Sequence, residues 1–336
     1  MILDNPEDKF SHEARRLLAW IAQRQGELEL TDSLLQLAAR AGVLHVLASD
    51  NDFRKNLGSY SAEYMATAAL GALKLENLRE ISCSMDRHGL EIMPIKGMAY
   101  ALMFGSGGPT RPMADVDFLV RERDFSNAVE VMKDLGYEER YFSRASRSTN
   151  HNELAFVRNG QLVEIHRAFV VRGRISVDYE SLFARSKPME SEGIKCRIMS
   201  PEDSFLYHCF HMGLHEFAVG GLRTVVELLD LLEKYPPDME LATRRAKVWG
   251  TCRITWCAMR IARTCMPGKI DPAWVESFAP GVLVRSLLQH LVVTPSLELM
   301  FSPGKLPRPV QLMRKALLLD RSYLAPGYLV RYLINA

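Results

Sequence analysis

Apolar residues recur at every third or fourth position over most of this chain, and that spacing is typical of amphipathic helices. The first helix is expected to begin near Asn5 and Pro6, since Asn is a common N-cap residue and Pro is favoured at the first helical position. Further helices are predicted over 32–40 and 61–88, and Gly89 is placed to end the second of these.

The pattern changes between residues 90 and 200, where short apolar runs predict strands. These expected strands cover 90–95, 115–120, 153–157 and 162–166. Asn159-Gly160 separates the last two, and this dipeptide is a strong signal for a tight hairpin turn. Helices are predicted over 97–104 and 124–135.

Helical spacing returns at Ser200-Pro201 and continues to about residue 265, then again from 280 to near the end. We therefore predict an α+β protein. A small mixed β-sheet in a core over 90–200 would lie between an N-terminal helical region (1–89) and a C-terminal helical domain (201–336). The flanking helices are expected to decide which acceptor molecule is used.

Composition restricts the class of protein but does not choose a function. The chain has 336 residues, with 42 Lys and Arg against 40 Asp and Glu, so its net charge of +2 makes no overall case for nucleic-acid binding. No uncharged apolar run reaches the roughly 18 residues of a membrane span, and the acidic N-terminus is unlike a signal peptide. The six cysteines form no C-x-x-C pair. We predict a cytoplasmic protein without a membrane partner and leave its oligomeric state open.

Candidate chemistry begins with Asp115-Val116-Asp117. Side chains alternate along a strand, so both aspartates would lie on one face, and they would repel each other unless a cation lay between them. Oxygen ligands in this arrangement suit Mg²⁺. Glu164 and His166 would likewise share a strand face, which offers a third carboxylate. Taken alone, each of these acids is better explained by an exposed strand position, and it is the surrounding sequence that favours a metal site.

Lys96-Gly97 lies between a predicted strand and a predicted helix. The backbone N–H groups at a helix start bind phosphate, glycine permits close approach, and the lysine adds positive charge. The alternative is a solvated lysine at the end of a strand.

The order of these features resembles the DNA-polymerase-β-type nucleotidyltransferase superfamily. The closer resemblance is to its uncharacterised nucleotidyltransferase family, over residues 75–235. The residues that carry it are Lys96-Gly97, Arg111-Pro112-Met113-Ala114-Asp115-Val116-Asp117 and Glu164-Ile165-His166. Most superfamily members have Gly-Ser or Gly-Gly where this chain has Lys96-Gly97-Met98. The usual phosphate-contacting hydroxyl is therefore missing, and transfer of a nucleotidyl or of a phosphoryl group stays open.

The resemblance implies a nucleotidyltransferase that depends on Mg²⁺ or Mn²⁺. It would move NMP from an NTP, with ATP expected, to a hydroxyl or phosphate of an unknown small molecule, peptide or RNA. Asp115, Asp117 and Glu164 would be the catalytic, metal-binding residues, and the nucleotide would be bound by Lys96, Gly97, Arg111 and His166. The alternatives are a phosphotransferase with the same fold and a non-catalytic nucleotide- or nucleic-acid-binding protein.

Two other patterns have simpler explanations. His208, His211 and His215 would share one helix face, which allows a zinc site but is better explained by histidines packed against the core. The basic residues of 241–270 and 302–336 suit either solvated helix faces or an anionic partner, and we favour the former.

Overall fold

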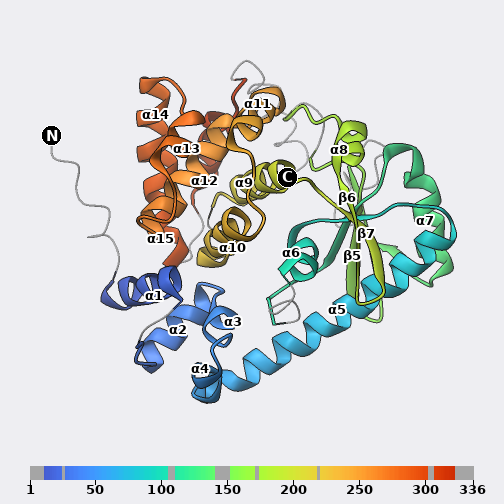
Figure 1. The fold of residues 1–336 in the computed structure, drawn as a ribbon, viewed down its shortest axis with the longest axis horizontal. Helices are drawn as coiled ribbons and strands as arrows, with labels where there is room; N and C mark the ends of the chain where they lie inside the picture. The colour runs from blue at the N-terminus through green and yellow to red at the C-terminus, as the bar shows by residue number, and fades with distance from the viewer. Residues whose placement is uncertain are drawn as a thin grey trace. The chain divides into compact units, whose positions relative to one another are not determined.

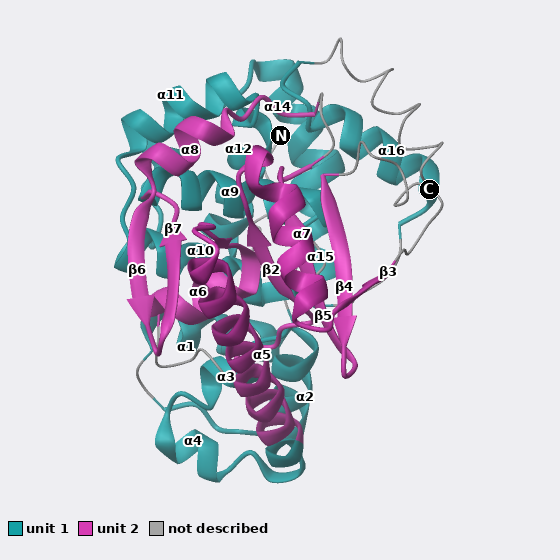
Figure 2. Cartoon of the chain, turned by 90° about the vertical axis from the view of Figure 1, so that its right-hand side faces the viewer, with its two compact units in different colours: residues 1–62, 201–329 teal, residues 63–200, 330–336 magenta. Residues whose placement is uncertain are grey.

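The computed structural model describes residues 11–24, 27–104, 110–140, 152–170, 174–217, 220–301 and 306–321. The chain divides into two compact units, residues 1–62 with 201–329 and residues 63–200 with 330–336 (Figure 2). Figure 1 labels the elements of both. The expected helix start near Asn5 lies outside the described residues.

The second unit contains a five-stranded sheet in the order β1-β2-β5-β4-β3. Its strands are β1 (Met93–Pro94), β2 (Val116–Leu119), β3 (Glu138–Arg140), β4 (Glu153–Arg158) and β5 (Gln161–His166). β2 and β5 run parallel, whereas the other neighbours are antiparallel, so the sheet is mixed as predicted. Asn159 and Gly160 have φ angles of 51° and 75°, the left-handed conformation that a two-residue hairpin turn requires.

Helices of this unit pack on the sheet through a shared apolar core. They are α5 (Ser61–Arg87), α6 (Lys96–Phe104) and α7 (Phe125–Asp134), with the 3₁₀ helix η3 (Glu122–Asp124) before α7. The unit also includes α8 (Tyr179–Arg185). Leu78 and Met85 of α5 and Met132 of α7 belong to one buried cluster with Phe118 and Ile165 of the sheet. The predicted end of α5 is confirmed, because Gly89 has a φ of 69° just beyond it.

One hairpin and one edge strand of the structure were not predicted from the sequence, and one predicted strand is shorter than expected. The missed hairpin pairs β6 (Lys187–Ser191) with β7 (Ile194–Ile198) through a turn at Glu192 and Gly193. The strand predicted over 90–95 shortens to Met93–Pro94, since the Ile92 carbonyl accepts a hydrogen bond from the Arg197 backbone N–H instead (2.8 Å). β3 was also missed because Glu138–Arg140 shows no apolar alternation.

The first unit is helical, as predicted for the two ends of the chain. Its N-terminal elements are α1 (His12–Gln23), α2 (Asp32–Arg40), α3 (Leu44–Leu47), α4 (Asn51–Lys55) and η2 (Gly58–Tyr60). Its C-terminal elements are α9 (Pro201–Leu214), α10 (Gly221–Lys234), α11 (Met239–Trp249), α12 (Cys252–Cys265), α13 (Pro272–Ser277), α14 (Val282–Leu288), the π-helix η5 (Gln289–Val293), α15 (Thr294–Phe301) and α16 (Arg308–Leu317).

Contacts between α2 and α10 join the two ends of the chain within this unit. A Cβ added to Gly221 would lie 2.9 Å from the Ala41 carbonyl oxygen, so only glycine allows this approach of the two backbones. The guanidinium of Arg24 also pairs with Asp230 at 3.0 Å. Among the helices that the structure describes, none is both long and apolar enough to cross a membrane.

Candidate functional site

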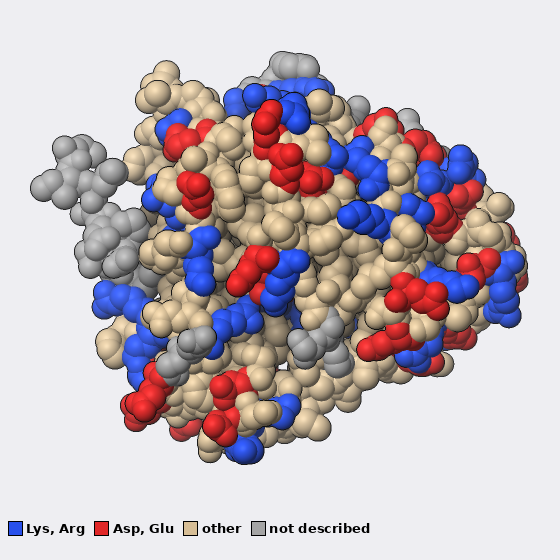
Figure 3. Space-filling view, in the orientation of Figure 1, with Lys and Arg blue, Asp and Glu red and all other residues tan. Residues whose placement is uncertain are grey.

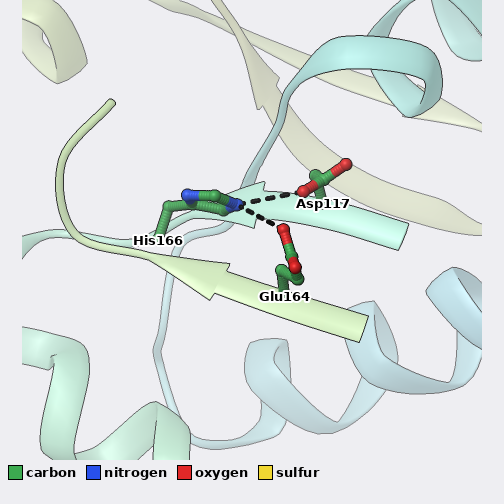
Figure 4. Close-up of side chains that lie close together, drawn as sticks. All are labelled: Asp117, Glu164 and His166. Carbon is green, nitrogen blue, oxygen red and sulfur yellow. Dashed lines mark hydrogen bonds and ion pairs between the residues drawn. The ribbon is translucent and has the colours of Figure 1, made fainter. Parts of the chain in front are cut away.

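Strand register brings together the acids of two distant sequence segments. In the parallel pair of β2 and β5, Asp117 lies opposite Glu164, and Leu119 lies opposite His166. Side chains of paired residues point to the same face of a sheet, so Asp117, Glu164 and His166 converge (Figure 4). The alternate residues Val116 and Ile165 are fully buried in the apolar core on the other face. The predicted alternation is therefore confirmed for these strands.

Lys96 extends into this cluster from the turn between β1 and α6. The Ile95 N–H donates to the Asp117 carbonyl (3.0 Å), and the chain then reverses at Lys96 with a φ of 51°. That left-handed conformation costs a non-glycine residue about 1–2 kcal/mol. The turn directs Nζ of Lys96 to within 2.7 Å of Asp117 Oδ1 and 3.4 Å of Glu164 Oε2. The alternative of a solvated lysine is thereby wrong.

His166 is buried, and each of its ring nitrogens lies near a carboxylate. Nε2 is 3.0 Å from Asp117 Oδ1 and 3.6 Å from Glu164 Oε2. Nδ1 is 3.2 Å from Oε2 of Glu153, the residue directly opposite His166 in the β4–β5 pair. The imidazole thus bridges acids that come from three strands.

Charges in the cluster shift one another's protonation. Burial alone would lower the pKa of His166, but Asp117, Glu153 and Glu164 together raise it above its usual value. Burial would likewise raise the pKa of Asp117, but His166 and Lys96 hold it below its usual range. His166 also lowers the pKa of Glu153. The cluster therefore combines anionic carboxylates with an imidazolium and an ammonium.

Asp115 lies just before β2, beside the cluster. Burial, together with repulsion from Asp117, raises the pKa of Asp115 to about 7, while Lys96 acts in the opposite direction.

Lys74 of α5, which was not among the predicted site residues, is buried and donates to Gln161 Oε1 (3.4 Å). Burial lowers the pKa of Lys74, whereas the charge of Asp115 raises it.

Arg111 and Gly97 meet at the first turn of α6. A Cβ added to Gly97 would collide with Nη1 of Arg111 and would lie 2.9 Å from Cγ of Met113. The absent side chain of Gly97 therefore lets the guanidinium lie over the start of the helix. Nη1 of Arg111 also donates to the Pro112 carbonyl (3.0 Å), and the guanidinium lies 5.7 Å from the ring centre of Tyr100.

The donor set fits a divalent cation. One ligand atom from each of Asp117, Glu164 and His166 lies within 4.8 Å of the others, and this is the only such group of His, Cys, Asp or Glu among the residues that the structure describes. Two of the three donors are carboxylates, which suit Mg²⁺ and Mn²⁺. The imidazole of His166 could ligate only in its neutral form, so an ion bound there would have to displace the proton on Nε2. Lys96 already places a positive charge against Asp117 and Glu164, so the acids are arranged around a cation.

The histidines of α9 form no such group within the described ranges. His208 is buried, and its Nε2 donates to the Thr224 carbonyl (2.7 Å). The His211 and His215 rings lie 4.6 Å apart, edge to face. His208 is therefore a structural histidine, although its hydrogen-bond partner lies in α10 of the same helical unit and not in the α/β core that the sequence favoured.

Glu153 is the site residue that the sequence analysis missed, although a signal was present. The predicted turn at Asn159-Gly160 pairs Arg158 with Gln161. Five further steps along each antiparallel strand pair Glu153 with His166, so the hairpin register alone would have placed this carboxylate beside the histidine.

A comparison with known protein families agrees with this fold. Residues 29–267 match the model of a family described as "Uncharacterised nucleotidyltransferase". That match covers more than half of the chain, which therefore belongs to the uncharacterised nucleotidyltransferase family, and the resemblance seen in the sequence is confirmed.

Two further comparisons add little. No curated protein matches this chain. A solved structure with some similarity is the solution structure of the antibiotic-resistance factor ANT(2'')-Ia, at 12% identity and a TM-score of 0.34, over 53% of this chain and 95% of that one. A likeness this remote carries no argument about activity.

Proposed function

We propose that this protein is a metal-dependent nucleotidyltransferase that moves NMP from an NTP to a hydroxyl or phosphate of an acceptor. One observation carries the proposal. β2 and β5, which are far apart in the sequence, pair so that Asp117 lies opposite Glu164. The ammonium of Lys96 lies against both carboxylates. Membership of a nucleotidyltransferase family supports the same reaction class.

Asp117 and Glu164, with Asp115 beside them, would hold Mg²⁺ or Mn²⁺. When bound, such an ion neutralises charge that develops on the phosphate oxygens during transfer. Glu164 has a side chain 17% exposed, against 2% for Asp117, so Glu164 is the better placed of the two to accept a proton from an incoming hydroxyl.

The phosphates would be bound at the start of α6. Backbone N–H groups at a helix start attract anions, and the Arg111 guanidinium lies over that turn. Lys96 would exchange part of its contact with the acids for phosphate oxygens. His166, held between carboxylates, would keep Asp117 and Glu164 oriented.

Labelled nucleotides test this proposal. The purified chain would be incubated with Mg²⁺, fractionated cell extract and each NTP, labelled at either the α- or the γ-phosphate, with ATP tried first. Incorporation of the α-label into an acceptor, abolished by EDTA and restored by Mg²⁺ or Mn²⁺, is the expected result. Incorporation of the γ-label alone would show a phosphotransferase. Incorporation of neither label would contradict both activities and leave a non-catalytic binding protein.

A further inference from the structure

We propose that Glu153 is a positioning residue, which fixes the imidazole of His166 so that Nε2 faces Asp117 and Glu164. The effect of Glu153 on the ring stands by itself. Its expected effect on metal binding rests on the proposed function.

The two ring nitrogens of His166 lie near different carboxylates, within hydrogen-bond geometry at Nε2 and by distance alone at Nδ1. Oε2 of Glu153 lies 3.2 Å from Nδ1, and Oδ1 of Asp117 lies 3.0 Å from Nε2. Turning the ring over would point ring carbons at the carboxylates and lose both polar contacts. Because Asp117 lies on β2 and Glu153 on β4, the imidazole is held from both sides of β5.

Glu153 is itself held in place. Nδ2 of Asn152 donates to the same Oε2 atom (3.2 Å), and the Asn152 carbonyl accepts from the Arg167 N–H (2.8 Å). Glu153 lies directly opposite His166 in the strand pair. Its anchored carboxylate therefore faces Nδ1 of the ring from a fixed direction. The resulting chain of contacts runs from Asn152 through Glu153 and His166 to Asp117.

The exposed fraction of the Glu153 side chain distinguishes a positioning role from a contribution to the apolar core. The side chain of His166 is 2% exposed, whereas that of Glu153 is 43% exposed. Removing the Glu153 carboxylate therefore leaves no cavity in the apolar core and exposes Nδ1 to water. Partners that orient metal ligands typically contribute about 10–100-fold to metal affinity or activity.

Nitrogen NMR of the histidine side chains tests the positioning directly. In ¹⁵N-histidine-labelled protein without metal, His166→Gln identifies the His166 signals. We expect Glu153→Ala to shift both ring-nitrogen signals of His166. Glu153→Gln keeps an oxygen acceptor for Nδ1–H and should restore most of the wild-type pattern. Glu138→Ala, an exposed glutamate of β3 in the same sheet, is the matched control and should change nothing. His166 signals that stay unchanged in Glu153→Ala would overturn the proposal.

Binding of Mn²⁺ alone, followed by electron paramagnetic resonance, measures the consequence for the site. We expect Glu153→Ala to weaken Mn²⁺ binding about 10–100-fold, and Glu153→Gln to stay within about threefold of wild type. Equal affinity of wild type and Glu153→Ala would overturn the link between ring position and metal. If wild type bound no Mn²⁺, the proposed function would fail, while the NMR result would still decide the role of Glu153.

Discussion

Two buried charged groups, one in each compact unit, have different kinds of partner. In the sheet-bearing unit, Asp117 and His166 contact each other and other charged groups, and Glu164 and Lys96 at the edge of the cluster remain partly exposed. In the helical unit, Arg314 of α16 is fully buried, and its Nη2 donates to neutral oxygens of Ser296 (2.5 Å), Glu216 (3.1 Å) and Val292 (3.4 Å).

This difference in partners distinguishes a binding site, at Asp117 and His166, from a structural contact between helices, at Arg314. Opposite charges that meet at a partly open edge can exchange one cation for another, so such a cluster suits ligand binding. Arg314 instead donates to the Glu216 carbonyl just beyond the end of α9 and to the Val292 carbonyl of the π-helix η5, which both also accept from the Ser296 hydroxyl. We infer that Arg314 connects α9, η5, α15 and α16, and that its charge matters less than its donors.

The largest expected effect is loss of transfer activity in Asp117→Asn. A neutral amide cannot hold a divalent cation as a carboxylate does, and it faces Lys96 and His166 with no charge to offset theirs. We expect transfer from the labelled NTP to fall by about 10³-fold or more, which corresponds to about 4 kcal/mol. Asp134→Asn, at an exposed position ending α7, is the matched control. Because Asp117→Asn can also disturb folding, Glu164→Gln provides a second measurement. Full activity in either folded variant would contradict the comparison between the units.

Arg314→Ala should have the next largest effect, and on stability. It leaves the Glu216 and Val292 carbonyls without this donor and creates a cavity, so we expect the free energy of unfolding to fall by about 3 kcal/mol. Arg314→Met fills much of the same volume without the charge and should cost less. Urea unfolding followed by circular dichroism measures both. Arg244→Ala, at an exposed arginine of α11, should stay within about 0.5 kcal/mol. Equal losses for Arg314→Ala and Arg244→Ala would show that the buried arginine does not tie the helices.

A smaller loss of stability is expected from Asp320→Ala. Its carboxylate accepts hydrogen bonds from the N–H groups of Cys252 (2.6 Å) and Arg253 (2.7 Å), and so caps the start of α12 from a distant part of the chain. Loss of such a cap costs about 1–2 kcal/mol. Asp320→Asn keeps one oxygen acceptor and should lose roughly half as much in the same urea titration. An unchanged midpoint for the alanine variant would exclude a capping role.

The smallest expected effect is on nucleotide binding in Gly97→Ala, which tests whether Arg111 belongs to the site. In Gly97→Ala, the new methyl group occupies the place of the Arg111 guanidinium, which is the far end of a flexible side chain and can move with little cost to the fold. We expect the Kd for MgATP, measured by calorimetry, to rise about fivefold, near 1 kcal/mol. Gly281→Ala, where a Cβ meets no neighbouring atom, is the control. A Kd unchanged from wild type would remove Arg111 from the phosphate site.

Local signals predicted much of the fold because their causes are local. The 32–40 helix coincides with α2, whose Thr31 side chain accepts from Leu34 N–H at the helix start. Asn159-Gly160 forms the predicted hairpin turn because left-handed φ angles suit these two residues. The exposed β3 escaped prediction, since Glu138–Arg140 has no apolar alternation and its partner β4 lies further along the chain. The β6–β7 hairpin was missed although a signal was present, since Ile194, Cys196 and Ile198 alternate along β7 and a two-residue turn joins the strands.

By itself, the sequence determined which side chains share a face, because alternation along a strand depends only on the backbone. It thereby grouped Asp117 with Asp115, and Glu164 with His166. Only the tertiary structure decided that β2 and β5 pair in parallel with Asp117 opposite Glu164, and that the turn at Lys96 directs its ammonium onto both acids. The physical reason is that pairing between strands some forty residues apart depends on the packing of the whole core, which no local pattern of residues encodes.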